Sequence, residues 1–193
     1  MANSYEEYAI RDRVPDAKKA VLLVIDMQEY FRGMAEPILP AIQRSIDLAR
    51  AARIPVIFTQ HSHNGPSEYG MLYEWWDGNL IMAGSPEAEL MPELPKLESD
   101  KLVPKHTYSG FYNTDLERHL KETGKTEVII TGVMTNLCCE TTAREAFIRG
   151  FRVFFSSDAT ATINEDLHVS SLKSLAYGFA YLVNVNSLAA MSK

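Results

Sequence analysis

The stretch VIITGVMTNLCCETTAREAF, residues 128–147, decides the fold. Its first four residues are apolar or β-branched, which predicts a short strand covered on both faces. Gly132 then marks a turn, and a helix is expected to begin near Leu137 and to end at Gly150. A strand that leads through a turn into a helix is the building unit of a parallel α/β sheet. The only two cysteines of the chain, Cys138 and Cys139, lie where this helix starts.

The alternation of strand and helix extends along the chain in both directions. Apolar runs predict strands at residues 21–25, 54–59, 153–156 and 181–185, and helical periodicity predicts helices at residues 37–53 and 164–176. Such alternation implies right-handed crossovers. We therefore expect an α/β fold of three layers, with a mostly parallel central sheet and helices on both faces. Residues 65–104 hold five of the nine prolines and are expected to form loops over one end of the sheet.

The composition bounds the class of protein. A chain of 193 residues fits one domain, taken as residues 1–193. The net charge of −6 argues against a nucleic-acid partner, because phosphate binding needs a clustered positive face. No apolar run approaches the roughly 18 residues of a membrane span, and the polar, acidic N-terminus does not look like a secretory signal. With two adjacent cysteines and no disulfide spacing, we expect a cytoplasmic protein that acts on a small molecule.

Polar side chains follow the predicted strands at the edge where ligands bind in such sheets. Asp26 follows the first strand, His61 and His63 follow the second, and Cys138 follows the strand at residues 128–131. Lys105 follows the short apolar stretch LVP. An acid, a base and a thiol are therefore expected to converge on one rim of the sheet.

Each of these residues has a structural alternative to a catalytic role. Asp26 can cap a turn, Lys105 can be solvated, and Cys138 or Cys139 can be a small buried apolar residue. The position of the two cysteines at a helix start argues against the last alternative, because a thiol at a helix N-terminus has a lowered pKa. The amides of the same turn could hold an oxyanion. The sequence alone leaves both readings open.

His61 and His63 raise the question of a metal. In an extended segment their rings would point to one side and could begin a metal site. A third protein ligand is needed, and nothing singles out the nearby Glu68. The alternative is a pair of loop histidines that hydrogen-bond or touch substrate. We therefore expect no cofactor, with a divalent metal at His61 and His63 as the weaker alternative.

Three motifs together resemble the isochorismatase-like hydrolases, a superfamily that includes nicotinamidases, N-carbamoyl amidohydrolases and isochorismatases. They are LLVIDMQ (residues 22–28), KHTYSGFYNTDLERHL (residues 105–120) and IITGVMTNLCCETTAREAFIRGFRVFFSSDATAT (residues 129–162), and the likeness runs from about residue 20 to residue 182. The resemblance implies the Rossmann-like fold of that superfamily. It also implies a homo-oligomer, because members commonly form dimers or tetramers.

The resemblance assigns roles to the residues of the rim. In the cysteine hydrolases of the superfamily an Asp, a Lys and a Cys form the catalytic triad, which corresponds here to Asp26, Lys105 and Cys138. A cis peptide is usual at the position of Val133 and Met134, and it turns the amides of Met134 and Cys138 toward the oxyanion. The expected substrate pocket comprises Gln28, Phe31, His61, Trp76, Tyr108 and Tyr112.

The resemblance leaves the substrate open. Nicotinamidases typically have an aspartate and several histidines as a metal site after the second strand, and here His61 takes the aspartate's place. The tract LYEWWDGNLIMAGSPEAELMPEL (residues 72–94) looks more like isochorismatases, which cleave a vinyl ether with the aspartate as general acid and lack the cysteine. Because Cys138 is present, we favour hydrolysis of a small amide through a cysteine thioester. Isochorismate hydrolysis through Asp26, and a non-catalytic binding protein on the same fold, are the alternatives.

Overall fold

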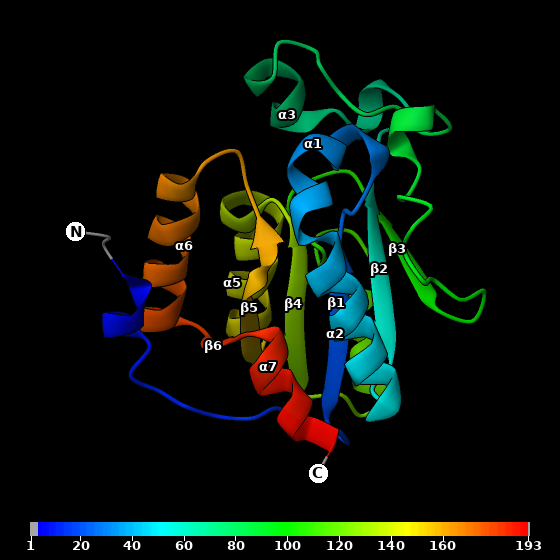
Figure 1. Ribbon diagram of the computed structural model, residues 1–193. Coiled ribbons are helices and arrows are strands. Elements are labelled where there is room, and N and C mark those ends of the chain that lie inside the picture. Colours follow the sequence, from blue (N-terminus) through cyan, green and yellow to red (C-terminus); the bar gives the residue numbers. More distant parts are fainter. Residues whose placement is uncertain (1–3, 193) are drawn as a thin grey trace.

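The computed structural model describes residues 4–192 and contains one six-stranded sheet with helices on both faces (Figure 1). All neighbouring strands are parallel, in the order β3-β2-β1-β4-β5-β6. The strands are β1 (Ala20–Ile25), β2 (Val56–His61), β3 (Lys101–Lys105), β4 (Glu127–Val133), β5 (Arg152–Ala161) and β6 (Tyr181–Val183). The predicted α/β fold with a parallel central sheet is confirmed.

The helices form the two outer layers and the cover of the sheet. They are α1 (Arg32–Ala35), α2 (Leu39–Ala51), α3 (Gly70–Trp75), α4 (Leu116–Glu122), α5 (Glu140–Ile148), α6 (Glu165–Gly178) and α7 (Val185–Leu188). Short 3-10 turns occur at Tyr5–Tyr8, Glu29–Phe31, Glu36–Ile38, Pro66–Glu68, Pro86–Ala88 and Ala189–Ser192. A π-helical turn, Thr135–Cys139, joins β4 to α5. No helix of the described residues is long and apolar enough to cross a membrane.

Strand β1 shows why the sheet is covered on both sides. All six of its residues are buried, and they alternate between two cores. Leu22 and Val24 pack on the side of α2 and α7, with Ile42 and Ile46. Leu23 and Ile25 pack on the side of α4, α5 and α6. A strand buried on both faces needs the continuous apolar run seen in the sequence.

Four elements differ clearly from the prediction. Strand β5, expected at residues 153–156, extends from Arg152 to Ala161. Strand β3 was expected only as an apolar stretch, because its burial alternates and it contains Pro104, a residue that the edge of a sheet tolerates. The expected helix at Leu137 begins instead as the π-helical turn, and α5 starts at Glu140. The last strand ends at Val183 because the side chain of Asn184 accepts a hydrogen bond from Ser187 and caps α7.

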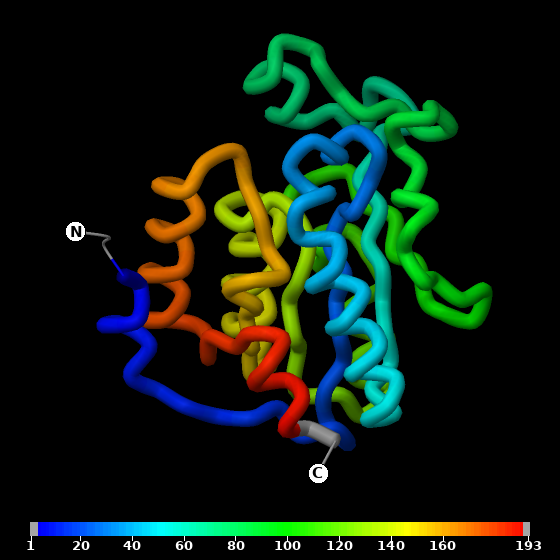
Figure 2. The backbone as a smooth tube through the Cα atoms, in the orientation of Figure 1, coloured from blue at the N-terminus to red at the C-terminus, as the bar shows by residue number. Residues whose placement is uncertain are grey.

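Residues 65–91 lie over the carboxyl end of the sheet, and the chain then runs down beside the sheet to the start of β3 (Figure 2). This covering segment contains α3 and contacts the chain that follows β1. The amide of Glu29 donates to the carbonyl of Glu89, and the amide of Met91 donates to the carbonyl of Met27. The predicted loop region therefore becomes a roof above the strand ends.

We expect Gly132→Ala to destabilise the protein by about 3 kcal/mol or more. Gly132 pairs with Ile25, has φ of +109°, and a Cβ built on it would lie 2.0 Å from the carbonyl oxygen of Ile25. Urea unfolding measures the loss. Gly124→Ala is the matched control, because Gly124 has φ of +67° but no atom within 4 Å of its Cβ position, so about 1 kcal/mol is expected. Equal losses in the two variants would refute the steric explanation.

Candidate active site

Asp26 and Lys105 form a fully buried ion pair where β1 and β3 end. Nζ of Lys105 lies 2.7 Å from Oδ2 of Asp26, and neither side chain is exposed. The contact is short enough for an ion pair, although Oδ2 receives no aligned hydrogen bond. Cys138, from the turn after β4, contacts both Asp26 and Lys105. The structure therefore brings the acid, the base and the thiol of the sequence prediction together.

Asp26 is held in place by Thr59 of the neighbouring strand β2. The amide of Asp26 donates to the hydroxyl of Thr59 at 3.1 Å, and that hydroxyl donates to Oδ1 of Asp26 at 2.6 Å. Asp26 itself has φ of +48°, so the chain turns sharply at the end of β1. Sequence reasoning missed Thr59, because a threonine inside an apolar strand carries no signal of its own.

Lys105 remains a charged ammonium in the protein interior. Burial lowers its pKa, but the Asp26 carboxylate and the Cys138 thiol raise it, and the net shift of the Lys105 pKa is upward. Nζ also donates to the carbonyl of Thr107 at 2.8 Å and lies 3.5 Å from Nδ1 of His61. The ammonium is therefore surrounded by acceptors, which is how a buried charge is stabilised.

The predicted lowering of the thiol pKa is wrong. Burial raises the pKa of Cys138 to about 12, and the negative charge of Asp26 adds to this rise, whereas Lys105 opposes it. Loss of solvation is the largest cause of this rise, and α5 begins only at Glu140, two residues after the thiol. At neutral pH the resting cysteine is a thiol, so a neighbouring base must take its proton before the sulfur can attack.

The peptide bond between Val133 and Met134 is cis, at the position given by the sequence analysis. The carbonyl of Met134 accepts hydrogen bonds from the amides of Leu137 and Cys139 at 3.1 Å each. Within residues 4–192, no acceptor is found for the amide of Met134 itself. An amide beside the thiol and without a partner is a donor that a ligand can use.

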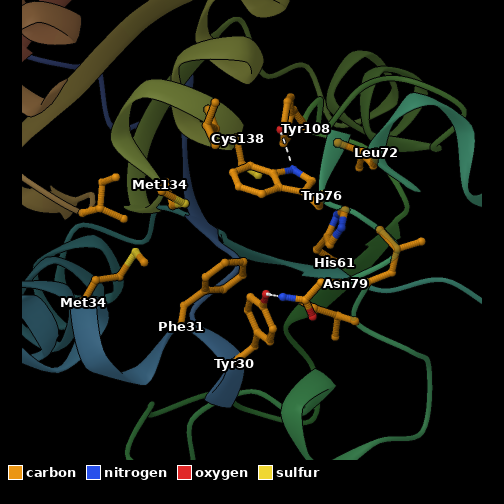
Figure 3. A pocket seen from close by; sticks show the side chains of 14 residues that line it. Tyr30, Phe31, Met34, His61, Leu72, Trp76, Asn79, Tyr108, Met134 and Cys138 are labelled. Carbon is orange, nitrogen blue, oxygen red and sulfur yellow. Dashed lines mark hydrogen bonds between the residues drawn. The ribbon is translucent and has the colours of Figure 1, made fainter. Parts of the chain in front are cut away.

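A cavity of about 250 Å³ opens beside Cys138 (Figure 3). It is lined by Tyr30, Phe31, Met34, His61, Leu72, Trp76, Asn79, Leu80, Ile81, Tyr108, Met134, Leu137, Cys138 and Ile163. Two hydrogen bonds join its walls: the indole N–H of Trp76 donates to the hydroxyl of Tyr108 at 3.0 Å, and the amide of Asn79 donates to that of Tyr30 at 3.1 Å. The mostly apolar and aromatic lining suits a flat ring.

Four of the six expected pocket residues line this cavity, and two do not. Phe31, His61, Trp76 and Tyr108 are in the wall. Gln28 is fully buried behind it, where its side chain donates to the carbonyls of His61 and Ala88 and accepts from the amide of His61.

Tyr112 is 53% exposed and packs edge-on against His106 outside the cavity. Sequence reasoning also missed Tyr30, Asn79 and Ile163, because they come from three segments, after β1, in the roof and after β5, that meet only in the folded chain.

His61 and His63 have no third ligand with which to form a metal site among the described residues. Their rings meet edge to face with centroids 5.0 Å apart. Nδ1 of His63 lies 3.3 Å from the carbonyl of Ile81, and its buried Nε2 has no partner. Glu68 is occupied by hydrogen bonds from Asn64. Among residues 4–192, no group of three or more His, Cys, Asp or Glu side chains is placed to hold a metal ion.

The fold agrees with comparison to known proteins. Residues 20–187 match the family model of the isochorismatase domain. The chain belongs to the isochorismatase family and is a hydrolase.

Two curated relatives and one solved structure show what the chain is similar to. Nicotinamidase 3 from Arabidopsis thaliana is 52% identical over 189 residues, which are 97% of this chain and 96% of that protein. Isochorismatase from Bacillus subtilis is 31% identical over 183 residues, 91% of this chain but only 58% of that protein. Among solved structures, a cysteine hydrolase from Pseudomonas syringae pv. phaseolicola 1448A matches with a TM-score of 0.88 and 27% identity, covering 94% of this chain and 95% of that one.

We expect Lys105→Met to lower the free energy of unfolding by about 3–5 kcal/mol, because it leaves the Asp26 carboxylate buried without its partner. Chemical denaturation measures the loss. The double variant Asp26→Asn/Lys105→Met removes both charges and should recover part of it. Lys101→Met is a control on the same strand, because its ion pair with Asp115 is partly exposed and worth less than about 1 kcal/mol. No recovery in the double variant would contradict the charge explanation.

We expect His61 to make stability depend on pH between 6.5 and 3. Burial, and then the charge of Lys105, lower the pKa of His61 to about 3 from an unfolded value of 6.5. The unfolded chain thus takes up a proton first, and stability is lost as the pH falls through this window. Between pH 7 and pH 5 the wild type should lose about 2 kcal/mol more than His61→Gln in urea unfolding. If the free energy of unfolding fell equally with pH in the two proteins, the lowered pKa of His61 would be ruled out.

Proposed function

We propose that the protein hydrolyses the carboxamide of nicotinamide to nicotinate and ammonia through a thioester on Cys138. The observation that carries this proposal is the 52% identity with Nicotinamidase 3 over 97% of the chain. It is supported by the contact of Cys138 with Asp26 and Lys105 beside an aromatic-lined cavity. A planar aromatic amide would fit between such walls with its carbonyl carbon beside the sulfur.

The first half of the reaction would form the thioester. Asp26 takes the thiol proton, and the sulfur of Cys138 attacks the carbonyl carbon. The amides of Met134 and Cys138 donate to the oxyanion of the tetrahedral intermediate. The C–N bond then breaks, and Asp26 returns its proton to the leaving nitrogen, which departs as ammonia.

The second half would release the acid. A water molecule gives a proton to Asp26 and attacks the thioester carbonyl, and the same two amides hold the oxyanion. The C–S bond breaks, the sulfur regains the proton from Asp26, and the carboxylic acid leaves. Lys105 keeps its charge throughout and stabilises whichever of Asp26 and Cys138 is negative.

The roles of Asp26 and Lys105 follow from the electrostatics of a dry site. When the proton moves from Cys138 to Asp26, the three side chains keep the same total charge, since a carboxylate is replaced by a thiolate beside the same ammonium. No additional ion has to be buried, so the high pKa of the thiol is offset by the neighbours that face it.

We expect Cys138→Ala to lower kcat for ammonia release from nicotinamide by at least about 10³-fold, because no nucleophile remains. A coupled ammonia assay measures it. The control is Cys139→Ala: this neighbouring thiol is fully buried, directed at the carbonyl of Thr131 at 3.9 Å, and absent from the cavity wall. Its replacement should cost about 1 kcal/mol of stability and less than threefold in rate.

The same variants separate the alternative function. Isochorismate hydrolysis through Asp26 would release pyruvate from both the wild type and Cys138→Ala, because that reaction needs no thiol. Pyruvate from both proteins, without ammonia from nicotinamide, would replace the proposed activity by the isochorismatase reaction.

Homo-oligomer formation, expected from the family resemblance, stays a prediction.

A further inference from the structure

His61 is a fixed part of the cavity wall whose ring the reaction just described does not use. It is the last residue of β2 and is only 7% exposed. The side chain of Gln28 binds both its amide and its carbonyl, at 2.7 and 2.9 Å. The ring of His63 packs edge-on against it. Its backbone and one side of its ring are thus held from behind, while the residue lines the cavity in front (Figure 3).

The neighbours of the ring decide which nitrogen carries the proton. Nδ1 of His61 lies 3.5 Å from Nζ of Lys105, and an ammonium has hydrogens but no lone pair. We therefore assign Nδ1 as the unprotonated nitrogen. The carbonyl of Thr107, which also lies near the ring, accepts from Lys105 at 2.8 Å. Because burial and the charge of Lys105 keep the ring neutral at pH 7, its single proton is on Nε2.

In this tautomer Nε2 of His61 carries the N–H, and the carbonyl of Thr107 near the ring is already bound by Lys105, so the cavity that His61 lines offers Nε2 its acceptor. Other donors in the wall have partners or access to solvent. The indole of Trp76 is bound to Tyr108 and the amide of Asn79 is bound to Tyr30. The two phenol hydroxyls can rotate toward water, since Tyr30 is 42% exposed and Tyr108 is half-buried. Nε2 of His61 has no protein partner of this kind among the described residues and faces the cavity, so a ligand that fills the cavity must supply its acceptor.

The atoms of a bound aromatic amide leave one acceptor for this donor. The carbonyl oxygen faces the amides of Met134 and Cys138 during the reaction, and the amide nitrogen presents hydrogens of its own. Within a pyridine-carboxamide, only the ring nitrogen still offers a lone pair. A benzene ring in the same place would leave the N–H of His61 buried and unpaired, which costs affinity and rate.

We infer that the Nε2–H group of His61 donates a hydrogen bond to the ring nitrogen of the substrate and so selects heteroaromatic amides over benzene carboxamides. This inference rests on the proposed function, because it takes the carbonyl carbon to lie at Cys138. It makes His61 a specificity-determining residue rather than a catalytic one.

The test compares nicotinamide with benzamide, which has the same shape but no ring nitrogen. For the wild type we expect kcat/KM to be about 10- to 100-fold higher for nicotinamide. His61→Asn keeps a polar group near the position of Nδ1 and lacks one at Nε2, so the ratio should fall to within about threefold of unity. His61→Gln places an amide N–H near the position of Nε2 and should restore most of the ratio.

The control variant Tyr108→Phe removes a hydroxyl from the same cavity wall. It tests whether that hydroxyl, rather than His61, carries the preference for nicotinamide, and we expect the preference to remain. Loss of the preference in Tyr108→Phe together with its retention in His61→Asn would overturn the assignment to His61. Equal kcat/KM for the two amides in the wild type would also overturn it, while leaving the proposed function standing.

Binding to Cys138→Ala separates the inference from the activity. Quenching of tryptophan fluorescence reports on the cavity, because Trp76 is in its wall. We expect nicotinamide to bind at least 10-fold more tightly than benzamide, and the difference to vanish in Cys138→Ala/His61→Asn. Selective binding without any ammonia release by the wild type would support the role of His61 and overturn the proposed activity. Failure of nicotinamide to bind or to be hydrolysed would overturn both.

Discussion

The buried contact between Asp26 and Lys105 is the constraint on which the rest of the structure depends. Two opposite charges in a protein interior lose their hydration, and their attraction compensates only if the surroundings also supply hydrogen bonds. Strand β2 supplies them from between the two residues, through the hydroxyl of Thr59. The chain after β3 adds the carbonyl of Thr107. The parallel sheet makes this possible because it brings the carboxyl ends of β1, β2, β3 and β4 to one edge.

The same burial explains how a cysteine with a raised pKa can belong to a reactive site. An exposed thiol is activated by lowering its pKa, whereas Cys138 is a thiol at rest and has its base in contact. The thiolate would exist only while a proton sits on Asp26. Such a thiol is protected from oxidation between turnovers, because oxidants react with the thiolate.

Sequence patterns were sufficient for the sheet and for the ionisable cluster, and insufficient wherever the outcome depended on packing. The β-branched run of β1 and the motifs around Asp26, Lys105 and Cys138 are local, so they can be seen without coordinates. Strand β3 has no such pattern, because an edge strand alternates in burial. Gln28 was expected in the pocket, but its amide satisfies backbone groups behind the wall.

The pKa of the Cys138 thiol is a second property that the sequence pattern did not predict. Position at a helix start suggested a lowered value, but the burial of Cys138 comes from residues far away in the chain and has the larger effect. Asn79 donates a hydrogen bond to Tyr30, which lies 49 positions earlier in the sequence, and no motif predicts such a contact. Composition and periodicity describe elements, whereas solvation and the lining of a cavity depend on how the elements meet.

The roof over the cavity is attached to the sheet unevenly. Its second half is bound through the backbone, where Gln28 bridges to Leu90, Met82 bridges to His63, and the amide of Met91 donates to Met27. Its first half, around α3, reaches the rest of the cavity wall through the side-chain hydrogen bonds of Trp76 and Asn79. The volume above Cys138 is therefore bounded by backbone pairing with the sheet on one side and by two side-chain hydrogen bonds on the other.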